Sequence, residues 1–151
     1  MAIRQKTVIK LKVSGHSPSH ARTDVSVRDL NVIIDEPIER GGTNLGASPT
    51  EFAYTSLMGC TTSIGNKCAH ALGVEIGELD YAMEVEFDRR GVLLQAEVDV
   101  PFPAIRLEVT AHGSATQEEL DKVATETAKY CAISKLFEAA GTKVEVNWRK
   151  A

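Results

Sequence analysis

The sequence lacks several features that would assign it to a common functional class. Its apolar runs all fall short of the roughly 18 residues that a membrane-spanning helix needs. Basic residues are in the minority, with 17 Lys and Arg against 21 Asp and Glu, and no cluster of them suits nucleic-acid phosphates. The N-terminal segment has no unbroken apolar stretch of the kind found in signal peptides. We therefore expect a cytoplasmic protein that binds neither membranes nor nucleic acids.

Cysteine is scarce, with Cys60, Cys68 and Cys131 as the only three. An odd, small number of cysteines without an export signal does not suggest a structural disulfide framework. There is also no Cys-x-x-Cys motif, which excludes a thioredoxin-type site. The three thiols are therefore expected to be inert core residues, metal ligands or reactive groups.

Patterns for metal or cofactor binding are also missing. His16 and His20 have a four-residue spacing, but the proline between them makes a ligand-bearing helix improbable. His70 and His112 belong to no ligand pattern, and the glycine-rich stretch 41–46 lacks the Gly-Lys-Ser/Thr ending of a phosphate loop. We expect no metal site and no bound cofactor.

What the 151 residues do contain is the mixture of patterns typical of one α+β domain over 1–151. A capping box at 116–119 predicts the start of a helix that continues to residue 140 and is bent or broken near Cys131. Residues 35–49 are too rich in Gly, Pro, Asn and Ser to form a regular element. A long helix is expected over 50–72. Alternating or apolar segments predict strands at 6–13, 22–28, 30–35, 79–88, 105–111 and 143–148, with a strand or excursion at 92–100.

The helix at 50–72 carries almost no charge between Glu51 and Lys67, so we expect it to be buried nearly all round. Cys60 lies in its middle, directly after Gly59. A glycine inside a helix costs roughly 1 kcal/mol relative to alanine. Close approach of another element is the usual compensation, and we expect one beside Cys60.

Two of the cysteines lie where thiol chemistry is plausible. Cys131 lies near the predicted helix break, where unpaired backbone N–H groups would favour a thiolate. An ordinary thiol with a pKa of about 8.5 is only about 3% thiolate at pH 7, so a reactive cysteine needs a nearby cation. A thiolate can reduce a peroxide and become a sulfenic acid, which a second thiol converts to a disulfide. Cys68 lies eight residues beyond Cys60, on another side of the helix, and is interpreted as packing.

The run DEPIERGGTNLGASPTEFAYTSLMGCTTSI resembles the osmotically inducible protein C and organic hydroperoxide resistance (OsmC/Ohr) family, and FPAIRLEVTAHG and CAISKLFEAAG agree with it. The resemblance covers nearly the whole chain. It implies an OsmC-like fold with antiparallel sheets around a long central helix. It also implies an intertwined homodimer, with sites at the interface that reduce organic hydroperoxides without a metal or cofactor. A dithiol, in the family a lipoyl-type group, regenerates the enzyme.

Carried over by motif, Cys60 matches the peroxide-attacking cysteine and Cys131 the resolving one. The family also uses an arginine from the N-terminal region, for which Arg22 is our choice and Arg40 the rival. Glu51 is the candidate for the family glutamate. In the family the glutamate directly follows the proline, whereas here Thr50 takes that position and Glu51 comes one residue later. The late cysteine motif differs too, because Ala132 replaces the proline that commonly follows the second cysteine.

Two other functions fit the same sequence. A ligand-binding or redox-sensing protein of this fold would show little peroxide turnover, and its Cys60 need not oxidise rapidly. A structural homodimer with buried, inert cysteines would react slowly with alkylating reagents. The residues around Cys60, including Phe52, Leu57, Met58 and Phe137, are expected to provide an apolar lining that favours alkyl hydroperoxides over hydrogen peroxide.

Overall fold

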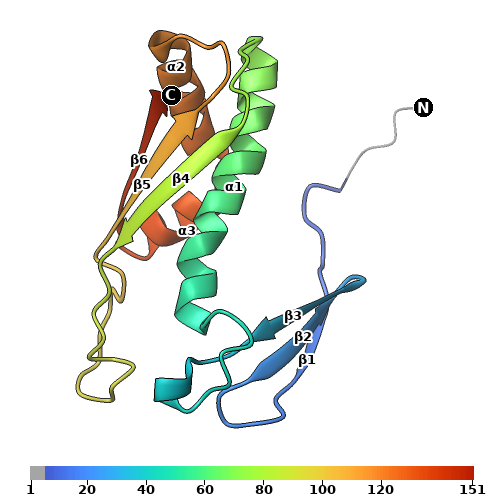
Figure 1. Cartoon of the computed structure of the whole chain (residues 1–151), viewed down its shortest axis with the longest axis vertical. Helices are drawn as coiled ribbons and strands as arrows, with labels where there is room; N and C mark the ends of the chain where they lie inside the picture. The colour runs from blue at the N-terminus through green and yellow to red at the C-terminus, as the bar shows by residue number, and fades with distance from the viewer. Residues whose placement is uncertain (1–5) are drawn as a thin grey trace. The chain divides into compact units, whose positions relative to one another are not determined.

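The computed structural model describes residues 6–151, which form two compact units, one ending at Phe52 and the other formed by Ala53–Ala151 (Figure 1). The α+β class and the OsmC-like fold predicted from the sequence are confirmed. The expectation of a single domain over 1–151 stays a prediction.

The first unit contains an antiparallel sheet in the order β1-β2-β3, formed by β1 (Val13–His16), β2 (Thr23–Val27) and β3 (Leu30–Ile34). A short 3-10 helix, η1 (Ile38–Arg40), follows within the irregular stretch that was expected between residues 35 and 49. The strands predicted at 22–28 and 30–35 are therefore confirmed as β2 and β3.

The strand predicted at 6–13 is wrong except for its last residue, Val13. The segment before Val13 is not a strand, and Val8, Ile9 and Leu11 are 85%, 63% and 81% exposed. The reason lies in the pairing of β1. Val13 is opposite Val27, the last residue of β2, so no β2 residue remains to pair with the alternating side chains before it.

The second unit contains a sheet in the order β4-β5-β6, formed by β4 (Leu79–Val85), β5 (Ala104–Ala111) and β6 (Lys143–Lys150). β4 and β5 are antiparallel, as expected, but β5 and β6 are parallel. The parallel pair follows from the crossover through α2 (Gln117–Tyr130) and α3 (Ala132–Ala139), which returns the chain to the same end of the sheet. Residues 92–100, left open as a strand or an excursion, form turns without a strand.

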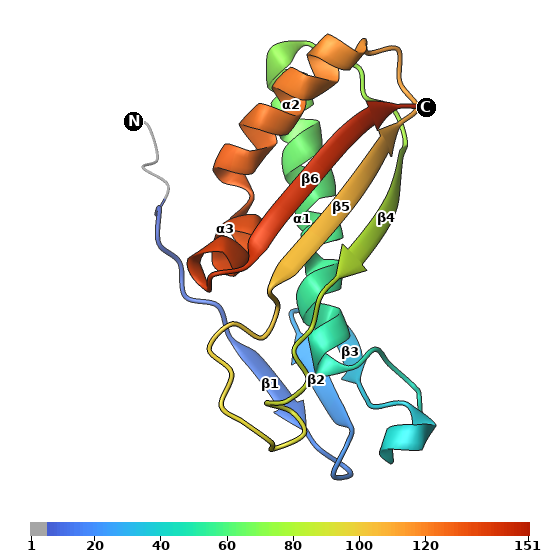
Figure 2. The same cartoon turned by 90° about the vertical axis from the view of Figure 1, so that its left-hand side faces the viewer.

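The three helices lie on one face of the β4-β5-β6 sheet (Figure 2). Alternate residues of β5 point into this helical face and are fully buried, namely Ile105, Leu107, Val109 and Ala111. They form one apolar core with side chains from α1 (Pro49–Leu72), α2, α3 and β6. Cys131 belongs to this core and Cys60 packs against it.

Helix α1 is buried along one side only, which corrects the prediction of burial nearly all round. The buried positions recur every three or four residues: Leu57, Thr61, Gly65, Cys68 and Ala69. The opposite side is exposed, because no other element of the second unit covers it. It carries mostly small polar residues instead of charges. The absence of charge in the sequence did not distinguish a polar surface from a buried one.

Candidate active site

Cys60 lies near the middle of α1 with its side chain half-buried. Two of the three hydroxyl residues that follow it, Thr62 and Ser63, form hydrogen bonds with other groups. Thr62 Oγ1 bonds to the Met58 carbonyl and to the Tyr81 hydroxyl, 2.7 Å away, while Ser63 Oγ donates to the carbonyl of Cys60. These bonds fix the turn of helix that carries the thiol.

Cys131 occupies the junction between two helices, ending α2 and capping the start of α3. The helix break predicted near this residue is therefore confirmed. Its sulfur accepts a hydrogen bond from the Ser134 backbone N–H at 3.5 Å, and the residue is only 2% exposed. A break in the helix thus directs the Cys131 sulfur into the core, where Cys60 lies.

The two thiols are neighbours in this core, and Cys60 acts on the pKa of Cys131; neither forms a disulfide. Burial, with a smaller effect of Cys60, raises the pKa of the Cys131 thiol to about 11, although the Ser134 and Ile133 backbone N–H groups act in the opposite direction. The backbone N–H groups at the helix break favour a thiolate as expected, but the net effect on Cys131 is a raised pKa. Burial in the core outweighs the two backbone N–H groups.

Aromatic rings pack together in the same core. Phe102 stacks on Phe87 with centroids 5.0 Å apart and makes edge contacts with Tyr54 and Phe137. Phe137 and Leu57 are almost fully buried and belong to the same core cluster as Cys131, whereas Met58 is partly exposed. The core cluster that contains Cys131, and against which Cys60 packs, is thus largely apolar.

Cys68 is 92% buried and separate from the Cys60–Cys131 pair, as its position on the helix predicted. It borders a shallow apolar depression between α1 and α2, beside Lys67 and Tyr130. Cys68 is a buried free thiol beside this depression, so it fits the packing role.

The candidate arginines lie in the first unit, each paired with an acid. Arg22 forms a two-point ion pair with Asp24, with distances of 2.6 and 3.0 Å. Arg40 pairs with Glu36 at 3.1 Å. The positive charge of Arg40 also acts on Glu51, so these two residues are electrostatic neighbours within this unit.

Glu51 lies in the first turn of α1, where it completes the N-terminal end of the helix. Its Oε2 accepts a hydrogen bond from the Ser48 backbone N–H at 2.7 Å. Bonds from Ser48 lower the pKa of Glu51, with a smaller contribution from Arg40, so the carboxylate is charged at neutral pH. The roles of Arg22, Arg40 and Glu51 stay predictions.

Asp35 is a residue that the sequence reasoning missed. It is completely buried, and its carboxylate accepts bonds from the N–H groups of Glu36, Thr43 and Leu45 and from the Thr43 hydroxyl, 2.6 Å away. These bonds lower its pKa to about 2. Asp35 thereby organises the irregular segment that leads to α1; an aspartate at the start of a Gly-rich stretch was the signal for it.

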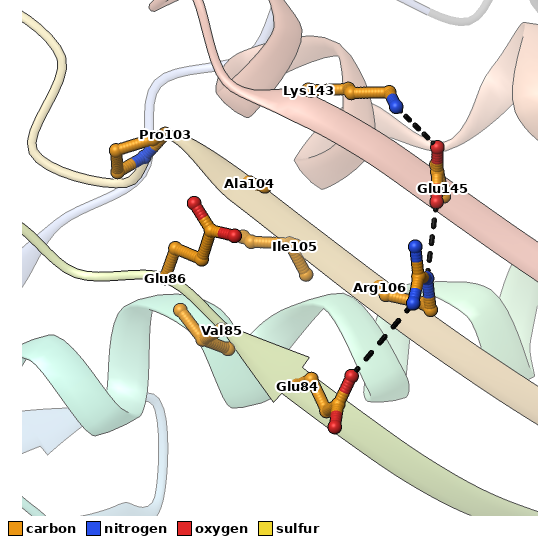
Figure 3. Close-up of a pocket in the computed structure, with 9 residues that line it drawn as sticks. All are labelled: Glu84, Val85, Glu86, Pro103, Ala104, Ile105, Arg106, Lys143 and Glu145. Atoms are coloured by element: carbon orange, nitrogen blue, oxygen red, sulfur yellow. Dashed lines mark hydrogen bonds and ion pairs between the residues drawn. The ribbon is translucent and has the colours of Figure 1, made fainter.

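A larger hollow of about 730 Å³ lies on the other face of the sheet (Figure 3). Its charged groups form a chain in which Glu84 and Glu145 flank Arg106, and Lys143 also pairs with Glu145. Arg106 alternates along β5 with buried neighbours, so this hollow and the core containing the cysteines lie on opposite faces of the sheet.

The described residues contain no group of three or more His, Cys, Asp and Glu side chains placed to hold a metal ion. Across residues 6–151, none of the helices combines the length and the apolar character needed to cross a membrane.

Comparison with known proteins identifies relatives of this arrangement. The sequence profile of a family described as OsmC-like protein matches residues 42–147, more than two thirds of the chain. No curated protein has a matching sequence. Among solved structures, an OsmC-like protein from Mycoplasma pneumoniae is similar over 95% of this chain and 98% of its own, with a TM-score of 0.78 and 16% identity.

Two similar structures have names that refer to organic hydroperoxide resistance. One is OsmC from Legionella pneumophila, with a TM-score of 0.63, 16% identity, and 97% of this chain and 99% of its own covered. The other is OhrB from Bacillus subtilis, with a TM-score of 0.64, 16% identity, and 93% and 98% covered. At this identity the likeness shows a shared fold.

Proposed function

The chain belongs to the OsmC-like protein family, and from this premise we propose that it reduces organic hydroperoxides with Cys60 and Cys131 as its redox pair. The observation that carries the proposal is the contact between these two free thiols. They come from positions 71 residues apart in the sequence, on different helices. Packing alone does not require two thiols to meet in this way.

The proposed reaction has two steps. The Cys60 thiolate attacks the peroxide and the O–O bond breaks, which gives a Cys60 sulfenic acid and an alkoxide that takes up a proton from solvent to become the alcohol. The Cys131 sulfur then attacks the sulfenic sulfur, forming the disulfide and releasing water. An external dithiol, such as a lipoyl-type group, returns both cysteines to the thiol form.

The unequal burial of the two cysteines supports this division of roles. Cys60 is partly exposed, so a peroxide can reach its sulfur, whereas Cys131 is 2% exposed and holds its proton tightly. A resolving thiol needs contact only with the sulfenic acid. The apolar core around Met58 and Phe102 favours an alkyl group over water, and thus an organic peroxide over hydrogen peroxide.

A cation is needed to hold the Cys60 thiolate and to orient the peroxide. Of the two candidates, Arg40 is better supported than Arg22, because its charge acts on Glu51, the candidate for the family glutamate. Arg22 is held instead by Asp24 in a two-point ion pair. We therefore propose Arg40 and Glu51 as the charged partners in this reaction.

We also propose that the protein is a homodimer. Gly59 supports this, because a Cβ atom added there would meet nothing within 4 Å in the second unit, so the expected close approach is missing within this unit. A second copy of the chain packing on the exposed side of α1 would explain the glycine. The same copy would cover the small polar residues of that side.

The test is consumption of cumene hydroperoxide by the purified protein with excess dihydrolipoamide, measured beside hydrogen peroxide. We expect the wild type to consume the organic peroxide faster, and Cys60→Ser to be inactive. Cys131→Ser should complete one oxidation and stop at a sulfenic acid, which dimedone labels and mass spectrometry detects. Cys68→Ser is the matched control, since it removes a thiol outside the pair, and it should retain activity.

A wild-type rate equal to that of the free dithiol would reject the peroxidase proposal. The protein would then be a ligand-binding or redox-sensing member of the family. Slow alkylation of all three native thiols in the same preparation would point to a structural role.

A further inference from the structure

A small cavity of about 90 Å³ borders Cys131 within the second unit. Helices α1, α2 and α3 and strand β6 all contribute to its wall. Its polar side chains include Ser134 and Glu138, both from α3. A buried water needs roughly 10–15 Å³ of such space together with polar partners, so the cavity has room for water.

Ser134 makes two hydrogen bonds along one side of this cavity, one to the buried thiol and one to a carboxylate at the protein surface. Ser134, which is 4% exposed, donates its backbone N–H to the Cys131 sulfur. The Ser134 hydroxyl donates to Glu138 Oε1 at 3.3 Å. Glu138 itself is exposed, so its carboxylate can exchange protons with solvent. Because Ser134 donates both bonds, a proton that leaves the Cys131 thiol needs a water in the cavity to reach the Ser134 hydroxyl and Glu138.

Cys131 needs such a connection because its reaction requires the loss of a proton. Burial raises the pKa of this thiol to about 11, so at neutral pH almost none of it is thiolate. A base that accepts the proton during the attack on Cys60 removes this obstacle. General base catalysis of this kind typically accelerates a step by about 10²–10⁴-fold.

We propose that Glu138, acting through Ser134 and a water in the cavity, accepts the proton that Cys131 loses when its sulfur attacks Cys60. Where Cys60 is a sulfenic acid, the inference rests on the proposed function. The Cys131 S–H bond breaks and its proton passes to Glu138. The sulfur–sulfur bond forms, and the sulfenic S–O bond breaks. The hydroxide that leaves takes up a proton from protonated Glu138 or from solvent to give water.

The other groups around Cys131 offer no alternative base. On α1 the titratable neighbour is Cys60, which is the group under attack. Apart from Cys131 itself, α2 and β6 line the cavity with residues that do not exchange protons near neutral pH: Ala124, Thr127, Ala128, Val144, Val146 and Trp148. Among the lining residues, Glu138 is the one carboxylate.

The experiment separates attack by Cys131 from peroxide chemistry by using 5,5′-dithiobis(2-nitrobenzoic acid). In a Cys68→Ala background, Cys60 reacts first and releases one thionitrobenzoate. Cys131 then displaces the second as the disulfide forms. We expect Glu138→Gln to leave the first release unchanged and to slow the second by roughly 10–100-fold at pH 7. Ser134→Ala should slow the second release similarly.

A pH profile distinguishes proton transfer from a structural effect. The second release in Glu138→Gln should approach the wild-type rate as the pH rises toward 9, because hydroxide then removes the Cys131 proton. Glu118→Gln, a matched loss of an exposed carboxylate on α2, should match the wild type at every pH. An unchanged second release in Glu138→Gln, or slowing by the same factor at every pH, would overturn the inference.

The same variants, treated with one equivalent of cumene hydroperoxide, report on the proposed function separately. If Cys60 forms no sulfenic acid, the peroxidase proposal fails, yet the thionitrobenzoate assay still decides the role of Glu138. If the peroxidase reaction proceeds and Glu138→Gln resolves its sulfenic acid as fast as the wild type, only the further inference fails.

Discussion

At the scale of single residues, the pKa of Cys131 results from two opposed effects. The backbone N–H groups at the start of α3 stabilise a thiolate, whereas the core around it and the nearby Cys60 stabilise the protonated form. The second effect is larger, because a charge buried away from water loses more solvation than two backbone donors restore. The thiol is thus held in the form that a resolving cysteine has before it attacks.

This protonation has a consequence for stability. The folded protein binds the Cys131 proton more tightly than the unfolded chain does, so the folded state keeps the full benefit below about pH 9 and loses it as the pH rises toward 11. We expect the unfolding free energy of the reduced wild type to fall across this range. Cys131→Ala should lack this component when both are unfolded in urea at pH 8–11. If the unfolding free energies of the wild type and Cys131→Ala changed with pH in the same way, the raised pKa of Cys131 would be contradicted.

The charged candidates in the first unit make a second prediction at this scale. Because Arg40 acts on Glu51 and Arg22 is held by Asp24, we expect Arg40→Ala to reduce kcat/KM for cumene hydroperoxide by about 10²-fold or more. Arg22→Ala should reduce it less. Arg106→Ala, on the opposite face of the β4-β5-β6 sheet from the cysteines, is the control that should retain activity. A larger loss for Arg22 than for Arg40 would reverse the assignment.

At the scale of elements, α1 depends on a close contact that only the structure revealed. A Cβ atom on Gly65 would lie 2.7 Å from Trp148 Cη2, so the glycine lets the indole of β6 pack directly against the helix. This contact fixes the distance between α1 and the end of the sheet. Together with the break between α2 and α3, this contact positions α1, which carries Cys60, and the helix junction that carries Cys131.

We therefore expect Gly65→Ala to lower the unfolding free energy by about 1–3 kcal/mol, because the added methyl group overpacks the Trp148 ring. Chemical denaturation measures the change. Ser56→Ala, on the exposed side of the same helix, should change stability by less than about 0.5 kcal/mol. Equal stability of Gly65→Ala and the wild type would show that the indole can move away at no cost.

At the scale of the whole molecule, the notable surface is one side of the long helix α1, which the second unit leaves exposed. Gly59 lies on this side with open space around its Cα. A glycine there weakens the isolated helix, so its presence is consistent with a second chain that approaches closely. The proposed homodimer depends on this surface.

If two chains pack there, a large side chain should keep them apart. We expect Gly59→Leu to raise the dimer dissociation constant by about tenfold or more in sedimentation velocity, since the interface must open around the new side chain. Thr125→Leu adds a comparable apolar side chain on the exposed side of α2 and should leave association unchanged. Identical sedimentation of Gly59→Leu and the wild type would reject packing at this position.

The sequence by itself determined most of the elements and indicated the two cysteines that we propose as the redox pair. Local signals such as the capping box at Thr116 and the alternation of 79–85 act within a few residues, so they can be read without the fold. The pairing of Cys60 with Cys131 came through resemblance to a family, because the two lie far apart in the sequence.

The tertiary structure decided what depends on neighbours from distant parts of the chain. It showed that the segment before Val13 has no strand to pair with, that α1 is buried on one side, and that Asp35 organises a loop. It also showed that burial outweighs the expected effect of the helix break on the pKa of Cys131. A pKa depends on burial and on every nearby charge, and these exist only after the chain has folded.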